Sequence, residues 1–216
     1  VGLVALGALD QLARHLGAAV RRRATPFVGL QETQSMLDQL ERAYPALVRN
    51  VVPKPVSLAL LADILRRLVE EGVSIRPLRE ILESLAIHAP NERDPVTLTE
   101  LVRAALKNAI THHHAPDGVL AVYLLDPMIE DAVRDAIQRT SAGSYLALAP
   151  QMAREIVAAI SAECGRDHGG AVLLTQADIR RFVRRLVEVE LPDLTVLSYQ
   201  ELSPEAQVQP LGRVGI

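Results

Sequence analysis

The chain has 216 residues, of which 49% are hydrophobic and 23% charged, and its formal net charge is −3. This hydrophobic fraction excludes a disordered chain, while the weak charge, the 3% aromatic content and the absence of Trp argue against nucleic acid as a partner. The single cysteine, Cys164, excludes an intrachain disulfide and a thiolate zinc cage. No stretch approaches the roughly 20 apolar residues of a membrane-spanning helix, so we expect the soluble part of a longer protein.

The first half of the chain predicts helices. An amphipathic helix is expected over residues 8–23, and apolar residues then recur at three- and four-residue steps in the segments 58–69, 78–86 and 98–109. Such stripes predict a helical bundle, with Pro53 and Pro55 separating two of its helices. The expected N-caps are Ser57, Ser74 and Asp94.

The second half predicts alternating strands and helices. Short apolar runs at Val119–Leu125, Ala171–Leu174 and Leu194–Leu197 are typical of strands buried on both faces. Helical patterns begin at Asp126-Pro127, at Pro150 and at Ala177, and the first extends to Ile137. The alternation predicts a mainly parallel sheet of three or four strands. Polar residues with Pro116 and Gly118 predict a linker between the halves at residues 112–118.

The residues most able to carry metal or thiol chemistry have simpler explanations. His112, His113 and His114 are adjacent, and neighbouring side chains on a helix point about 100° apart, so the three cannot share one ion. We interpret them as a solvated helix end, where cationic histidine is favourable. Cys164 has His168 four residues away, but Gly165 follows it, and a buried structural thiol is the preferred interpretation.

No catalytic motif is present: the chain lacks a dinucleotide fingerprint, a phosphate loop, a nucleophile elbow and a zinc-protease helix. Asp126 and Asp178 fall at predicted helix starts, where capping explains them. We therefore predict no enzyme, no cofactor and no metal. The alternative kept open is a small-ligand α/β enzyme with its site at the strand ends near Asp126, Thr175 and Ser198.

A basic helical face is the remaining charge signal. Arg180, Arg181, Arg184 and Arg185 recur at three- and four-residue spacing. A solvated face is one interpretation, and a protein-contact face, as in a generic adaptor domain, is the other. From this face Arg180 and Arg184 are candidate contact residues.

Several ordered sequence blocks carry a family resemblance. They are Gly29-Leu30-Gln31-Glu32-Thr33-Gln34, Val51-Val52-Pro53-Lys54, Val73-Ser74-Ile75-Arg76 and the run Leu191–Leu202, which contains Leu197-Ser198-Tyr199-Gln200-Glu201. In this order the blocks resemble the cytoplasmic C-terminal region of the export-gate protein of type III secretion systems, the FHIPEP family, with the injectisome form favoured over the flagellar one. The resemblance covers nearly the whole chain.

The resemblance implies a division into three parts and a mixed α and α/β fold. Residues 1–27 would be the end of an incomplete first subdomain, residues 28–113 a helical ring-forming third subdomain, and residues 114–216 an α/β fourth subdomain with a mainly parallel sheet. The family's second subdomain is missing from this chain.

The function implied by the resemblance is that of a docking platform. Proteins of this family are anchored in the bacterial inner membrane, and their cytoplasmic regions form a ring of about nine subunits. The ring receives chaperone–substrate complexes, gatekeeper proteins and the stalk of the ATPase complex. The helical region mixes acidic and basic residues, and we expect ring or partner contacts from Arg66, Arg67, Glu70, Arg76, Arg79 and Glu83.

Overall fold

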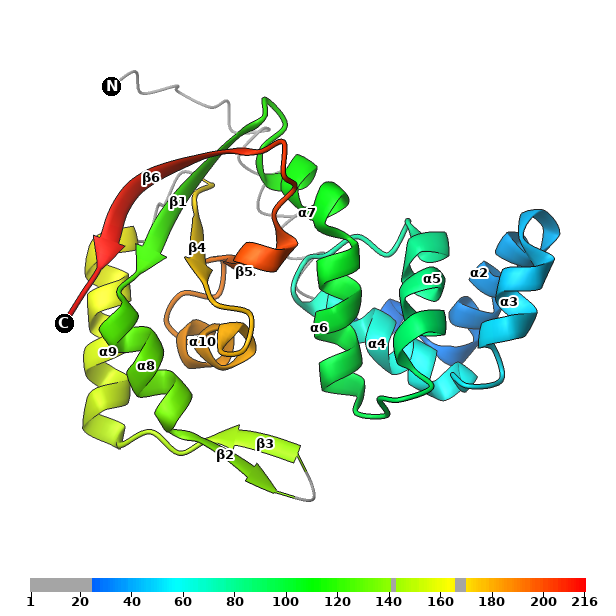
Figure 1. Ribbon diagram of the computed structural model, residues 1–216, viewed down its shortest axis with the longest axis horizontal. Coiled ribbons are helices and arrows are strands. Elements are labelled where there is room, and N and C mark those ends of the chain that lie inside the picture. The colour runs from blue at the N-terminus through cyan, green and yellow to red at the C-terminus, as the bar shows by residue number, and fades with distance from the viewer. Residues whose placement is uncertain (1–24, 141–142, 166–169) are drawn as a thin grey trace. The chain divides into compact units, whose positions relative to one another are not determined.

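The computed structural model describes residues 25–140, 143–165 and 170–216. The chain forms two compact units, Val1–Val102 and Arg103–Ile216, which are described separately (Figure 1). The helix predicted over residues 8–23 lies outside the described residues. Of the segment expected to end a first subdomain, the short 3-10 helix η1 (Thr25–Phe27) is described.

The first unit is a helical bundle, as predicted. Its helices are α2 (Leu30–Ala43), α3 (Pro45–Val51), α4 (Leu58–Glu70) and α5 (Leu78–His88), followed by α6 (Pro95–Ala105), which continues into the second unit. Leu61, Leu65 and Leu68 of α4 are fully buried, as their spacing predicts. Each such leucine contributes about 1.5–3 kcal/mol through burial, and this stripe therefore holds α4 in the bundle.

Two of the three predicted N-caps are confirmed. The Ser57 hydroxyl accepts from the Leu60 amide at 3.1 Å at the start of α4. A carboxylate oxygen of Asp94 accepts from the Thr97 amide at 3.1 Å in the first turn of α6. The Ser74 prediction is wrong, because α5 begins only at Leu78 and the Ser74 hydroxyl accepts from the Arg76 amide within the preceding turn.

The second unit is the predicted α/β domain. Its elements are α7 (Lys107–His114), β1 (Val119–Leu125), α8 (Pro127–Asp135), β2 (Ile137–Thr140), β3 (Gly143–Leu146), α9 (Pro150–Cys164), β4 (Val172–Thr175), α10 (Arg180–Val187), β5 (Val196–Ser198), the 3-10 helix η2 (Tyr199–Glu201) and β6 (Gln207–Val214). The four-stranded sheet has the order β5-β4-β1-β6 and all its neighbours are parallel. The prediction of a mixed α and α/β fold with a parallel sheet is therefore confirmed.

Helices α8, α9 and α10 cover one face of this sheet (Figure 1). Fully buried side chains from each helix, including Ile129, Ile160 and Val183, pack in one cluster with Leu173 of β4. Within α8, Ile129 and Val133 of this cluster are four residues apart, as are Ile156 and Ile160 within α9, which is the spacing of one helical face. The core is almost wholly aliphatic, which agrees with the low aromatic content.

The unit boundary lies within α6, whereas the expected subdomain boundary lies between residues 113 and 114. The last turn of α6 and all of α7 consequently belong to the α/β unit. Residues 112–114, expected in a linker, are the last turn of α7. The chain then turns at Gly118, whose φ of +82° is a conformation that favours glycine.

The strands β2, β3 and β6 were not predicted. Ile137, expected to face inward on a helix, begins β2, since α8 ends at Asp135 and the chain turns into a hairpin. Strand β6 lies at a sheet edge and is mostly exposed, so it has no continuous apolar run. It contains Pro210, and a register shift makes Leu211 the extra residue of a β-bulge.

Candidate protein-interaction site

The α4–α5 charged surface comprises the six residues expected to make ring contacts. They are Arg66, Arg67 and Glu70 on α4, Arg76 in the connection, and Arg79 and Glu83 on α5. The leucine stripe of α4 and the apolar residues of α5 point into the bundle. Because of this, the charged residues between them lie on the outer sides of the helices.

Two arginines of this surface are engaged within the bundle. Arg66 Nε donates to the Val28 carbonyl at 2.7 Å and thereby ties the chain before α2 to α4. Arg67 Nε donates to an Asp63 carboxylate oxygen at 3.1 Å, one helical turn earlier. Both side chains are half-buried, and each loses these hydrogen bonds if it turns toward a partner.

Arg79 is held in place by two neighbours. Its Nε donates to Glu83 at 2.8 Å, its Nη1 donates to the Tyr44 hydroxyl at 3.3 Å, and its guanidinium lies 4.8 Å from the centre of the Tyr44 ring. The hydrogen bond to Glu83, followed by that to Tyr44, raises the pKa of Arg79 above its ordinary value. Arg79 and Glu83 therefore form an exposed ion pair within one turn of α5, oriented by Tyr44.

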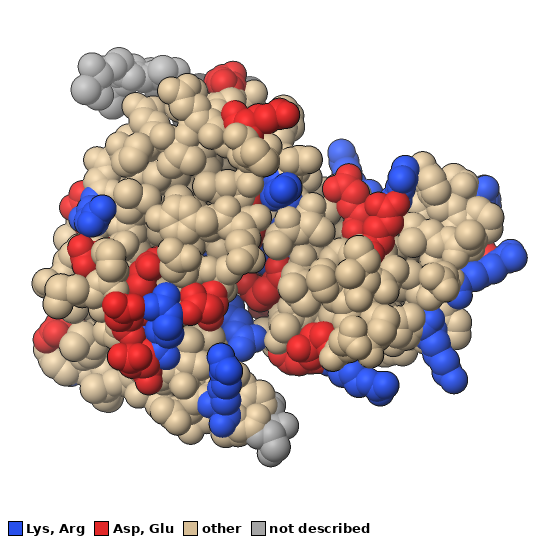
Figure 2. Space-filling view, in the orientation of Figure 1, with Lys and Arg blue, Asp and Glu red and all other residues tan. Residues whose placement is uncertain are grey.

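Glu70 and Arg76 differ from the other four residues. Both are exposed, and neither side chain has a hydrogen bond or ion pair among the residues that the structure describes. On the face shown in Figure 2, cationic and anionic side chains of the helical unit are interspersed rather than separated. Glu70 and Arg76 can thus pair with charges of another chain without breaking an internal contact.

The predicted basic face of α10 is contradicted at Arg180, whereas Arg185 is exposed as predicted. Arg180 is fully buried, and its Nη1 donates to the Val196 carbonyl at 3.3 Å. Arg184 is half-buried and donates to the Leu194 carbonyl at 2.9 Å and to the Pro192 carbonyl at 3.0 Å. These two arginines hold the segment that follows α10 through its carbonyls, and Arg180, being fully buried, is not available as a contact residue.

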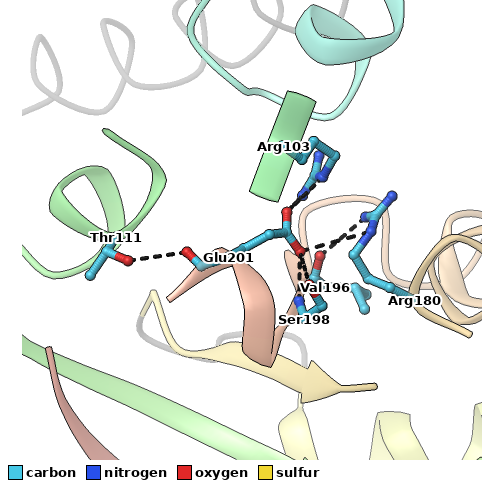
Figure 3. Close-up of polar contacts among 6 residues, drawn as sticks. All are labelled: Arg103, Thr111, Arg180, Val196, Ser198 and Glu201. Carbon is cyan, nitrogen blue, oxygen red and sulfur yellow. Dashed lines mark hydrogen bonds and ion pairs between the residues drawn. The ribbon is translucent and has the colours of Figure 1, made fainter. Parts of the chain in front are cut away.

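Buried Glu201 is the centre of the polar interior of the α/β unit (Figure 3). Its Oε1 accepts from Arg103 Nε and Nη2, both at 2.6 Å. Its Oε2 accepts from the Ser198 amide at 2.6 Å and hydroxyl at 2.8 Å, with Arg180 Nε at 3.9 Å. The Thr111 hydroxyl donates to the Glu201 carbonyl at 3.2 Å. We call these five residues the Glu201 network.

The Glu201 network was missed, although its sequence signal is present. Ser198 and Glu201 stand three residues apart, which is the spacing of a capping box, and the structure contains that box at the start of η2. The box satisfies the local backbone, but both arginines that pair with Glu201 come from distant helices. No sequence spacing connects Arg103, which lies 98 residues away, with Glu201.

The structure confirms the interpretation of Cys164 and part of that of the three histidines. His112, His113 and His114 end α7 as predicted, but burial, followed by repulsion from His113 and Arg103, lowers the pKa of His114 to about 4. His114 is therefore neutral at pH 7, not cationic as expected. Cys164 is a buried thiol as predicted, and desolvation raises its pKa to about 12. His168 lies outside the described residues.

The residues proposed for the alternative enzyme site are used internally. The Asp126 carboxylate caps α8 by accepting from the Met128 amide at 2.9 Å. The Thr175 hydroxyl donates to buried Glu130 at 2.9 Å, and Ser198 belongs to the Glu201 network. Asp178 does not cap α10 as predicted but accepts from Arg134 Nε at 2.6 Å. The three side chains named for this site, Asp126, Thr175 and Ser198, are therefore each engaged within the α/β unit.

Among the described residues, no group of three or more His, Cys, Asp or Glu side chains is placed to hold a metal ion. Among the same residues, every helix is too short or too polar to cross a bilayer.

Comparison with known proteins decides the family. The model of the FHIPEP family matches residues 1–207. The chain belongs to the FHIPEP family. It is 40% identical over 204 residues to the Low calcium response locus protein D of Yersinia pestis, which covers 93% of this chain and 29% of that protein. The chain thus spans less than a third of the length of this curated relative.

Solved structures of this family have the same fold. The Chlamydia pneumoniae CdsV protein, solved in complex with CdsO, matches with a TM-score of 0.88 and 43% identity over 97% of this chain and 63% of that one. The nonameric EPEC SctV-C matches with a TM-score of 0.86 and 38% identity over 95% of this chain and 63% of that one. The resemblance to the type III secretion export gate is confirmed, and the family is one of secretion components rather than enzymes.

Proposed function

We propose that this chain is the ring-forming and docking part of an export gate that is anchored in the bacterial inner membrane. The observation that carries this proposal is its family membership together with a 38% identical relative that was solved as a nonamer. In the intact protein, about nine copies form a ring beneath the membrane. The ring receives chaperone–substrate complexes, gatekeeper proteins and a stalk protein, and the Chlamydia relative solved with CdsO supports binding of a partner.

The α4–α5 charged surface supports the ring part of the proposal. A head-to-tail ring joins two different faces of one subunit, and exposed charges of opposite sign on these faces can pair across the contact. Glu70 and Arg76 are exposed and have no partner among the described residues, whereas Arg79 and Glu83 already satisfy each other. We therefore assign the strongest ring contacts of this surface to Glu70 and Arg76.

The same charges predict that the ring is weak without its anchor. Exposed ion pairs contribute about 0.2–1 kcal/mol each and are screened by salt. A membrane anchor raises the local concentration and supplies the missing association energy. The isolated chain should then sediment mainly as a monomer in dilute solution, and a stable nonamer at the lowest concentration would contradict this.

The ring assignment is tested in the full-length protein. Arg76→Glu should reduce chemical cross-linking into subunit ladders and should reduce secretion, while the amount of protein in the membrane stays unchanged. The matched control is Arg154→Glu, an exposed arginine of α9 in the other unit. Normal ladders and normal secretion with Arg76→Glu would refute the assignment.

Docking needs a separate measurement. The complete cytoplasmic region of the protein should bind a cognate export chaperone loaded with cargo in a titration by isothermal calorimetry. Arg76→Glu should leave the affinity per subunit unchanged, because Arg76 is proposed for the ring contact and not for docking. Absence of binding with intact rings would refute the docking part alone.

A further inference from the structure

A pocket lies between strand β3 and helix α10 of the α/β unit, and it shares no residue with the α4–α5 charged surface. Its volume is about 380 Å³. It is lined by Ser144, Tyr145, Leu146, Phe182, Arg185 and Leu186. All these residues belong to the second unit.

The pocket has an apolar floor that continues into the core. Phe182 and Leu186 are four residues apart, so they share one face of α10. Phe182 belongs to the core cluster, and Leu146 and Leu186 pack against that cluster while partly exposed. Tyr145 is 55% exposed at the rim. An apolar side chain placed here would be removed from water at about 25 cal/mol per Å² of buried surface.

One edge of the pocket is an unpaired strand edge. In the hairpin, the Ala147 amide donates to the Ala136 carbonyl at 2.9 Å, and the ladder continues toward the turn with Gln138 opposite Tyr145. Hydrogen-bonded and non-bonded pairs alternate in an antiparallel ladder, so Tyr145 bonds toward β2. The amides and carbonyls of Ser144 and Leu146 consequently point away from β2.

These backbone groups have no other partner within the part of the chain that the structure describes. Two donors and two acceptors spaced along β3 are the pattern that an added strand satisfies. A lipid headgroup offers no matching row of amide donors and acceptors. The geometry therefore favours an extended polypeptide over a lipid.

The pocket also carries a positive charge. Arg185 lines it and is exposed, and its guanidinium has no ion pair or hydrogen bond with any described residue. Arg184 on the same helix is occupied by backbone carbonyls, so Arg185 is the cation that can meet a ligand. A carboxylate is the natural partner, because a guanidinium can donate two hydrogen bonds to it.

We propose that the pocket binds an extended segment of a partner protein that carries an apolar residue and an acidic residue two positions apart. The segment adds to β3 through the backbone of Ser144 and Leu146. Residues two apart in a strand face the same side, so both side chains are directed at α10. The apolar one covers Phe182 and Leu186, and the acidic one pairs with Arg185. This binding does not depend on ring assembly.

The first experiment selects ligands without assuming a partner. A displayed library of random twelve-residue peptides is panned against the full chain, and enriched peptides are titrated by fluorescence polarisation. We expect enriched sequences to share an apolar residue and an Asp or Glu two positions apart. No enrichment, or enriched peptides without this pattern, would overturn the proposal.

Variants locate the site. Arg185→Glu should weaken the enriched peptide at least about tenfold, which corresponds to about 1.4 kcal/mol. Arg154→Glu, an exposed arginine on α9, should change the affinity less than about twofold. Ser144→Pro removes one edge amide at a position where an edge strand tolerates proline, and should also weaken binding. Equal binding by Arg185→Glu and the unmodified chain would overturn the proposal.

Hydrogen exchange on the unmodified chain tests the β3 contact even if Ser144→Pro fails to fold. With the unmodified chain, the peptide should slow exchange at the Ser144 and Leu146 amides but not at the amides of β6. Protection elsewhere would overturn the proposal. Two other results would also overturn the proposal. One is a concentration-dependent dimer of the chain that is lost with Arg185→Glu. The other is binding to phosphatidylglycerol vesicles that is lost with the same substitution.

Discussion

Glu201→Gln should be among the most destabilising single changes in the α/β unit. The substitution keeps the shape of the side chain but removes the negative charge between Arg103 and Arg180, which are both buried. It also replaces one accepting oxygen by an NH₂ group that faces donors, either those of Arg103 or those of Ser198. Buried donors without an acceptor are costly because they have also lost their water.

The size of the loss follows from the contacts. Two unit charges about 4 Å apart interact by about 4 kcal/mol at the effective dielectric constant of a protein, and removing one partner of a buried pair costs about 3–5 kcal/mol. The carboxylate accepts four hydrogen bonds of 2.6–2.8 Å, two from Arg103 and two from Ser198. A loss of at least about 3 kcal/mol is therefore expected.

Urea unfolding followed by circular dichroism measures this loss, and hydrogen exchange at the amides of α7 and η2 assigns it to the α/β unit. Glu205→Gln is the matched control, because Glu205 is exposed and its side chain has no hydrogen bond or ion pair among the described residues. It should change the free energy of unfolding by less than about 0.5 kcal/mol. If Glu201→Gln behaves like this control, the reasoning about the buried charge is wrong.

Three further outcomes are expected. Burial lowers the pKa of His114 from 6.5 to about 4, so the unfolded state binds more protons between these values. The chain should lose up to about 3 kcal/mol as the pH falls from 6.5 to 4, and His114→Asn should remove that part of the decline in urea titrations. Burial raises the pKa of the Cys164 thiol to about 12, so at pH 8 this thiol should react with dithionitrobenzoate at least about 100-fold more slowly in the folded chain than in the chain unfolded by urea. Equal rates in the two states would contradict its burial. Asp94→Ala should cost about 1 kcal/mol through loss of the α6 cap, against less than about 0.5 kcal/mol for Asp38→Ala on exposed α2 surface.

Elements with an internal pattern could be predicted from the sequence. The leucines of α4 recur with the period of a helix, and the apolar run of β1 has the length of a buried strand, so both elements can be recognised from their own residues. Strand β6 could not be found in this way, because an edge strand with one exposed side needs no apolar run. The hairpin was missed for a related reason: β2 and β3 are short, mostly exposed and stabilised by each other.

The charged residues were harder to interpret than the apolar ones. Arg180, Arg184 and Arg185 look alike in sequence, yet the first is buried, the second binds carbonyls and only the third is exposed. Their differences are set by acceptors supplied from outside the helix, namely the loop after α10 and Glu201. Helical spacing shows which residues share a face but not whether that face meets water or buried oxygens.

Two kinds of charged site therefore occur in this chain. In the α/β unit, Arg103, Arg180 and Glu201 are buried together, and an ion pair in the interior gains little net stability because each charge has lost its hydration. Such a network instead fixes how elements pack. The oxygens of Glu201 must all meet donors, and this requirement sets the positions of η2, α7 and the end of β5. On the bundle, Glu70 and Arg76 stay hydrated and fix nothing internally. Exposed charges such as these suit a subunit contact that forms and breaks. The buried Glu201 network suits an α/β unit whose structure does not change when that contact forms.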